Sequence, residues 1–174
     1  MAAPRFVEQL NTQIGNEFAA HQQYVAIAVH FDALTMSRMA AFFYRQAMEE
    51  RDHAMMMVQY LIDADEQVII PGVASPTTEF ADIEEPIVLA LAQEKAVTAQ
   101  INELTGIARD ERDFASDQFM QWFIKEQVEE VATMSDLLTV VRRSRDDVED
   151  IEEWVAREAG DEGDDPTAPR PAGA

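Results

Sequence analysis

The chain has 174 residues, of which 47% are hydrophobic and 27% charged, a balance typical of one folded globular domain. Its 34 acidic residues against 13 basic ones give a formal net charge of -21 at pH 7, which opposes broad contact with nucleic acid or an anionic membrane. Cysteine is absent, so disulfides and thiolate chemistry are excluded, and a bound metal must be held by oxygen and nitrogen. No apolar run is long enough to span a membrane and the start is unlike a leader peptide, so a soluble, cytoplasmic protein is expected.

Four long helices are predicted from the positions of the residues that break helices. Glycine and proline gather around Pro71-Gly72, Ser75-Pro76, Pro86 and the C-terminus, and the stretches between them are rich in Ala, Leu, Met, Glu and Gln. The four predicted helices cover residues 6–32, 37–64, 83–109 and 114–143. At 1.5 Å per residue each is roughly 40 Å long. Helices of that length, outside membranes and coiled coils, are typical of a four-helix bundle, so an all-α fold is expected.

The links between these helices predict how the bundle is connected. The links after the first and third helices are short, which makes the helices on either side antiparallel. Residues 65–82 form a crossover long enough to span the bundle, so the second and third helices are expected to run parallel. A fifth, shorter helix is predicted over 146–158. Residues 159–174 are expected to form a disordered acidic and proline-rich tail that follows a domain of residues 1–158.

Each long helix carries one carboxylate in the middle of its apolar stripe. At 100° per residue the inward acids, in chain order, are Glu17, Glu50, Glu94 and Glu130. His53 lies one turn after Glu50, which gives a Glu-x-x-His pair facing the core. Four carboxylates in one apolar core would be costly to desolvate and would repel one another, so they require protons or cations.

Two divalent cations would balance these four carboxylates charge for charge, and His53 would add a neutral nitrogen donor. Oxygen ligands with one imidazole and no sulfur suit iron or manganese better than a closed structural zinc site. The pattern therefore predicts a dinuclear metal centre. Bundles of this type often carry a second Glu-x-x-His, but here Thr133 stands where the second histidine would be. The second metal is therefore expected to bind more weakly than the first.

Taken together, these motifs resemble those of the non-haem bacterial ferritins, and the resemblance covers residues 6–158. The segments that carry it are Asn16-Glu17-Phe18 with Tyr24, Glu49-Glu50-Arg51-Asp52-His53, Glu94, and Glu126-Gln127-Val128-Glu129-Glu130. The resemblance implies a ferritin-like four-helix bundle with a short fifth helix. It also implies ligands for a first iron, which are Glu17, Glu50 and His53, and for a second iron, which are Glu94, Gln127 or Glu130, and the bridging Glu50.

The same resemblance implies further site residues beside the iron pair. An additional iron site would be formed by Glu49, Glu126, Glu129 and Glu130. Of these, Glu49, Glu126 and Glu129 lie off the centres of the apolar stripes, so surface charge is the alternative interpretation. Tyr24 matches the tyrosine next to the ferroxidase centre, where it would donate an electron or a hydrogen bond. No haem is expected, because Arg51 follows the bridging Glu50 where haem-containing relatives have methionine.

The implied function is iron storage and detoxification by a ferroxidase. Fe(II) would be oxidised by O2 or peroxide at the dinuclear centre, and ferric oxyhydroxide would be deposited inside a homo-oligomeric shell of twenty-four subunits. The alternatives are a non-storing diiron oxidoreductase or peroxide scavenger, and a metal-free helical interaction bundle. The resemblance places Asp117 at an iron entry channel of the shell, whereas the local pattern also suits an acid that complements a helix dipole.

Overall fold

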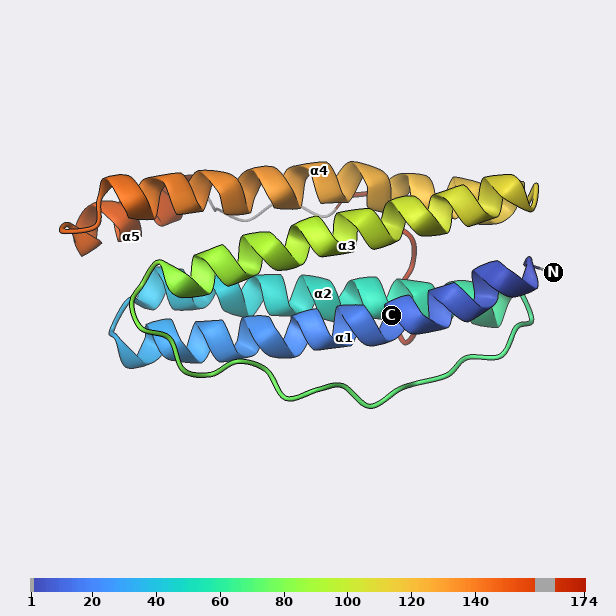
Figure 1. The fold of residues 1–174 in the computed structure, drawn as a ribbon, viewed down its shortest axis with the longest axis horizontal. Helices are drawn as coiled ribbons and strands as arrows, with labels where there is room; N and C mark the ends of the chain where they lie inside the picture. The colour runs from blue at the N-terminus through green and yellow to red at the C-terminus, as the bar shows by residue number, and fades with distance from the viewer. Residues whose placement is uncertain (1, 159–164) are drawn as a thin grey trace.

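A computed structural model describes residues 2–158 and 165–174 of the chain. The helices of this part are α1 (Pro4–Ala33), α2 (Ser37–Asp63), α3 (Glu85–Asp110), α4 (Phe114–Arg143) and α5 (Val148–Glu158) (Figure 1). The all-α prediction is confirmed, and each predicted helix end lies within two residues of the observed one. No described helix combines the length and the apolar character that crossing a membrane requires.

The four long helices form two antiparallel pairs, α1 with α2 and α3 with α4 (Figure 1). Residues 64–84 leave the end of α2 and run along the outside of the bundle to the opposite end, where α3 begins. As a result α2 and α3 run in the same direction, which confirms the predicted crossover. Short turns join the members of each pair, because only three residues separate the paired helices.

Three of the long helices end in the same hydrogen-bonded motif without using glycine. Thr35, Asp65 and Arg112 follow α1, α2 and α3 and have φ angles of 64°, 58° and 57°. In each case the amide of the next residue donates to the carbonyl five positions earlier, which is the Schellman pattern. The left-handed conformation costs a non-glycine residue about 1 kcal/mol. These hydrogen bonds end the three helices at non-glycine residues. The glycine positions in the sequence therefore do not mark these helix ends.

Buried amide side chains of α1 hold the crossover against the bundle. The Asn11 amide donates to the Gln67 carbonyl (3.0 Å) and its oxygen accepts from the Ile69 amide (2.6 Å). Further along α1, Gln23 makes the same paired contact with the backbone of Thr77, at 2.9 and 2.8 Å. These bonds satisfy backbone groups of a segment that has no helix or strand partner of its own.

A close approach between α1 and the crossover explains one glycine. A Cβ atom added at Gly15 would lie 2.8 Å from Cγ of Pro71, which is shorter than real Cβ contacts. Any larger residue at this helix position would displace the proline ring. Gly15 therefore lets the crossover lie directly on α1 despite the lower helix propensity of glycine.

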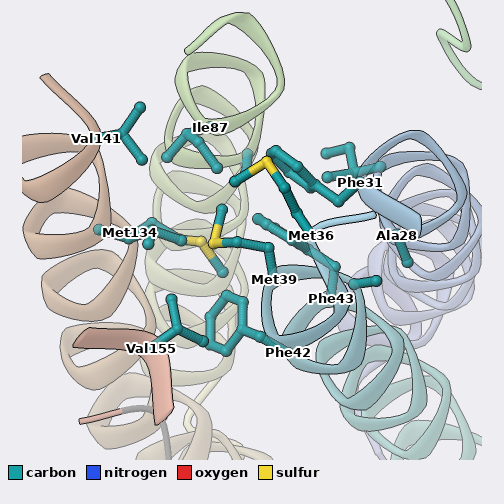
Figure 2. Close-up of a cluster of buried hydrophobic side chains, with 14 of the residues drawn as sticks. Ala28, Phe31, Met36, Met39, Phe42, Phe43, Ile87, Met134, Val141 and Val155 are labelled. Atoms are coloured by element: carbon teal, nitrogen blue, oxygen red, sulfur yellow. The ribbon is translucent and has the colours of Figure 1, made fainter. Parts of the chain in front are cut away.

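The apolar core consists of two clusters at opposite ends of the bundle. The α5-end cluster, drawn in Figure 2, includes Phe31, Met39, Phe43, Ile87, Met134 and Val155. The N-terminal cluster includes Phe6, Leu10, Met57, Ile101 and Phe123. Figure 2 shows Val155 of α5 directed at Phe42 of α2, so the short helix closes its end of the core. The level between the two clusters is polar.

The fifth helix also supplies the cap that α2 lacks. No side chain of the preceding turn caps α2. The carboxylate of Glu152 in α5 instead accepts from the backbone amides of Arg38 and Met39, at 2.9 and 2.8 Å. A carboxylate at this position satisfies two free amides and complements the positive end of the helix dipole.

The predicted tail covers 159–174, and residues 159–164 of it lie outside the described part of the chain. Residues 165–174 lie against α2 and α4. The Asp165 carboxylate accepts from Nε1 of Trp122 and Nζ of Lys125, both at 3.2 Å, and the Ala172 amide donates to the Met55 carbonyl at 3.0 Å. Asp165 and Ala172 make these contacts as single residues, without a periodic apolar pattern in the sequence around them. The sequence alone therefore does not predict that this segment packs on the bundle. The division into a 1–158 domain and a tail stays a prediction.

Replacing Asn11 by Ala removes the bonds to Gln67 and Ile69 and leaves two crossover groups without their partners. We expect the free energy of unfolding, measured with urea at pH 7, to fall by about 1–3 kcal/mol. The control is Thr12→Ala, since the exposed Thr12 hydroxyl bonds only the Glu8 carbonyl within its own helix. Equal stability of the two variants would contradict the anchoring role of Asn11.

Candidate metal centre

Five ionisable side chains meet at the polar level between the two apolar clusters. They are Glu17 of α1, Glu50 and His53 of α2, Glu94 of α3 and Glu130 of α4, and none is more than 7% exposed. Each of them is buried because apolar residues one turn away on the same helix face the core. The predicted inward orientation of these side chains is therefore what the structure shows.

The side chains form two overlapping groups of candidate ligands. In one group, ligand atoms of Glu17, Glu50 and His53 all lie within 4.8 Å of one another, and in the other the same holds for Glu50, Glu94 and Glu130. Glu50 belongs to both groups. A carboxylate shared by two neighbouring groups has the position that a bridge between two metal ions requires.

A third group joins this buried level to the surface. Ligand atoms of His53, Glu126 and Glu130 also lie within 4.8 Å of one another, and Glu126 is half-buried. Glu49 and Glu129 are exposed and belong to none of the three groups. They line the mouth of a cavity of about 500 Å³ between α2 and α4, into which His53 opens.

Two acidic residues that line this cavity are absent from the predicted site. Asp52 lies on its α2 side, and Asp165 reaches it from the C-terminal segment. Asp165 is held there by Lys125 and Trp122, and the Trp122 ring contacts His53 edge-on with ring centroids 5.5 Å apart. Asp165 follows the bundle by many residues, so helical periodicity does not place it at this mouth.

Burial and mutual repulsion set the protonation of the buried carboxylates. Burial raises the pKa of Glu17, and it raises the pKa of Glu94 to about 7. Burial together with neighbouring carboxylates raises the pKa of Glu50 and of Glu130 well above the ordinary value. Without cations the group therefore retains protons near neutral pH, and divalent cations would replace those protons.

His53 responds to burial in the opposite sense. Burial lowers the pKa of His53 to about 4, so the imidazole is neutral at pH 7. Its Nδ1 lies 3.6 Å from a carboxylate oxygen of Glu50 and 3.6 Å from one of Glu130. A neutral imidazole with a free nitrogen lone pair is the form that binds a metal ion.

Neutral donors hold one oxygen of several carboxylates in the group. The Tyr24 hydroxyl donates to Glu94, and the Gln13 amide donates to Oε1 of Glu17 at 2.8 Å. Within the described residues, Oε2 of Glu17, Glu50 and Glu94 is buried and accepts no hydrogen bond. Buried carboxylate oxygens without a donor are costly, so this donor set fits bound cations.

Tyr24 lies beside the buried glutamates, where its hydroxyl donates to Glu94. It is fully buried between α1 and α3. Burial and the charge of Glu94 raise the pKa of Tyr24 well above its ordinary value, so its hydroxyl keeps its proton and donates.

The structure also bears on the choice between Gln127 and Glu130 as a ligand. The Gln127 amide nitrogen donates to Glu130, and its oxygen accepts from the Thr98 hydroxyl at 2.9 Å. In this arrangement the Gln127 amide oxygen already accepts a hydrogen bond, whereas the Glu130 carboxylate offers a negative charge to a cation. The geometry therefore favours Glu130 over Gln127 as the metal ligand. Thr98 lies one turn after Glu94, a spacing from which it could have been identified.

The acids at the start of α4 have separate local roles. Asp113 is the N-cap of α4, where its carboxylate accepts from the Ser116 amide at 3.1 Å. Asp117 forms an ion pair with Nε of Arg109 at 3.1 Å. A role of Asp117 in iron entry stays a prediction.

Comparison with known proteins relates the chain to iron-storage proteins. A family model described as a ferritin-like domain matches residues 7–144. The chain is 50% identical to the ferritin BfrB of Mycolicibacterium smegmatis over 169 residues, which is 97% of this chain and 93% of that one. It is 34% identical to a bacterial non-heme ferritin of Staphylococcus epidermidis over 147 residues, which is 84% of this chain and 89% of that one.

Solved structures give the same result for the fold. An open pore ferritin from the archaeon Archaeoglobus fulgidus superimposes with a TM-score of 0.85 at 29% identity, covering 89% of this chain and 96% of that one. An engineered closed form of the Archaeoglobus fulgidus ferritin gives a TM-score of 0.86 at 28% identity, covering 90% of this chain and 98% of that one. The region matched by the family model, residues 7–144, contains all four buried glutamates.

The raised pKa values predict how the stability of the metal-free protein depends on pH. The pKa of Glu94 is about 7 in the folded protein and 4.5 without burial. The stabilisation that this difference gives is fully present below pH 4.5 and is lost as pH rises through 7. The lowered pKa of His53 makes the free energy of unfolding rise with pH, but only below pH 6.5, the ordinary pKa of histidine. Above pH 6.5, where His53 no longer offsets it, we therefore expect the free energy of unfolding to fall as pH rises through about 7.

Urea unfolding of metal-free protein at several pH values measures this effect. Glu94→Gln should flatten the pH dependence, because the amide does not titrate. The control is Glu103→Gln on the exposed side of the same helix, which should leave the slope as it is in the unsubstituted protein. A Glu94→Gln variant with an unchanged slope would rule out the assigned protonation.

Proposed function

The chain belongs to the ferritin family and is an iron-storage protein, and from this premise we propose that it oxidises Fe(II) at the buried glutamate–histidine centre. In this proposal Glu17, Glu50 and His53 bind the first Fe(II), and Glu94 and Glu130 bind the second with Glu50 as the bridge. The observation that carries the proposal is the position of Glu50 in both ligand groups, with Glu17 in one and Glu94 in the other each having a buried oxygen without a donor.

The chemistry follows from the charge and the hardness of the ligands. Carboxylate oxygens stabilise Fe(III) more than Fe(II), so binding at this centre favours oxidation. Two Fe(II) ions give up one electron each, and O2 takes the two electrons with two protons to form hydrogen peroxide. With peroxide as the oxidant, the same two electrons and two protons give two water molecules. Placing two Fe(II) side by side makes the two-electron step available.

The remaining residues of the centre keep the site ordered and dry. The neutral His53 offers nitrogen without adding charge, and Trp122 and Phe123 pack against its ring. Tyr24 holds Glu94 by its hydroxyl and is placed to donate a hydrogen bond or an electron. The second iron has no histidine of its own, so we expect it to bind more weakly. No haem takes part in this proposal.

The cavity between α2 and α4 is the proposed route between the centre and the surface. Glu126 and Glu130 lie with His53 at its inner end, and Glu49 and Glu129 lie at its mouth. These four glutamates would form the additional iron site and pass Fe(III) out of the bundle.

Removing Glu50 and His53 together tests the centre directly. We expect Glu50→Ala with His53→Ala to lose rapid Fe(II) oxidation, because the variant lacks the bridge and the nitrogen donor. Helical content should be retained, since removing a buried charge relieves repulsion in the metal-free bundle. Stopped-flow absorbance under air measures the rate, and circular dichroism measures the helices.

The matched control removes one glutamate and one histidine outside the centre. Glu103→Ala with His30→Ala takes an exposed acid from α3 and a half-buried histidine from α1. This control should oxidise Fe(II) at the unsubstituted rate. Rapid oxidation by the Glu50/His53 variant would defeat the ligand assignment.

Storage of a mineral requires a hollow assembly, and the proposal includes a shell of twenty-four identical chains. Light scattering after size-exclusion chromatography should give a particle of twenty-four 19.6-kDa chains. After aerobic Fe(II) loading, iron should remain with that particle far in excess of two ions per chain. A small oligomer that retains only two ions per chain would instead indicate a non-storing diiron oxidoreductase. The cytoplasmic location stays a prediction.

A further inference from the structure

A chain of hydrogen bonds along α1 ends on one oxygen of Glu17. The Asn16 amide nitrogen donates to Oε1 of Gln13 at 3.0 Å, and the Gln13 amide nitrogen donates to Oε1 of Glu17 at 2.8 Å. Gln13 is fully buried, whereas Asn16 is half-buried and lines the groove between α1 and the crossover. Gln13 is not among the ligands proposed above and belongs to neither apolar cluster, so its burial requires another explanation.

We propose that Gln13, oriented by Asn16, is a positioning residue that makes Glu17 a metal ligand through Oε2 alone. The inference rests on the proposed function, because it concerns the ligand geometry of the same centre. Oε1 of Glu17 is occupied by the Gln13 amide, while Oε2 is buried and accepts no hydrogen bond within the described residues. One oxygen is therefore held by the protein and the other is left for the cation.

Other carboxylates of the centre show the same division. Glu94 accepts from the Tyr24 hydroxyl and Glu130 accepts from the Gln127 amide, so each has one oxygen held by a neutral donor. Glu50 differs, since its Oε2 is buried and accepts no hydrogen bond within the described residues, and ligand atoms of Glu17, Glu94 and Glu130 lie within 4.8 Å of its own. In the proposal, a neutral donor therefore limits each terminal glutamate to one free oxygen.

Asn16 determines which end of the Gln13 amide faces Glu17. Because Asn16 donates to the Gln13 oxygen, the Gln13 nitrogen must point the other way, toward the carboxylate. An acceptor at position 16 would attract the Gln13 nitrogen and turn its oxygen toward Glu17. Two oxygens would then face each other in a buried site, and Glu17 would have to rotate away.

The test measures metal binding without oxidation, with Co(II) as the probe under anaerobic conditions. Metal-free protein is titrated by calorimetry, and the visible absorption of bound Co(II) reports its coordination number. In Gln13→Leu we expect the first binding step to weaken roughly 10- to 100-fold, as for other residues that orient a metal ligand. We also expect weaker Co(II) absorption, since a second Glu17 oxygen becomes free to coordinate.

The isosteric variant Asn16→Asp separates positioning from electrostatics. An added negative charge by itself would tighten Co(II) binding, whereas a reversed Gln13 amide weakens it and changes the spectrum. We expect weakening. The matched control is Gln23→Leu, which removes another buried glutamine of α1 that bonds only the crossover backbone, and its titration should match the unsubstituted protein.

Each outcome decides the inference. It is overturned if Gln13→Leu binds Co(II) with the affinity and spectrum of the unsubstituted protein, or if Asn16→Asp binds more tightly with an unchanged spectrum. Should Gln13→Leu fail to fold, as judged by circular dichroism, the isosteric Asn16→Asp decides alone. Absence of Co(II) binding in the unsubstituted protein would overturn the proposed centre itself, which distinguishes the two failures.

Discussion

The constraint on which the structure depends is the burial of four carboxylates at one level of an apolar bundle. Glu17, Glu50, Glu94 and Glu130 come from four different helices, so the repulsion among them acts directly on helix packing. Protons relieve it in the metal-free protein, as the raised pKa values of all four glutamates indicate. Cations relieve it more fully, because they compensate the charge and use the oxygens that lack donors. Stability and metal binding are thus two consequences of one arrangement.

The rest of the fold supplies what such a centre needs. Apolar clusters on both sides exclude water and hold the four helices at the spacing the carboxylates require. The crossover makes α2 and α3 run in the same direction (Figure 1). Glu50 and Glu94, from opposite halves of the chain, thereby lie in one group of candidate ligands. Asn11 and Gln23 tie the crossover to α1, and the interior contacts at the other end are completed by α5. The polar centre is therefore stabilised by packing that lies away from it.

Neutral donors distinguish the buried glutamates although these are chemically alike. A hydroxyl from Tyr24 and an amide from Gln13 each engage one oxygen of a carboxylate, whereas Oε2 of Glu50 accepts no hydrogen bond within the described residues. Where a donor lies decides which oxygen remains for a cation. The surrounding hydrogen bonds thus leave one oxygen of Glu17 and one of Glu94 without a donor, and the burial of His53 keeps its imidazole neutral.

The sequence by itself determined the helix spans, the crossover and the inward acids, because a period of 3.6 residues and an interrupted apolar stripe are local properties. The Glu-x-x-His spacing placed Glu50 and His53 on the core face, and the resemblance to the non-haem bacterial ferritins implied Glu50 as the bridge. Only the tertiary structure decided which groups cap, cover and orient these elements. Glu152 caps a helix that begins more than a hundred residues earlier, and Asp165 reaches the cavity beside His53. Such contacts join residues far apart in the chain, and no periodicity links their positions, so they exist only once the helices have packed.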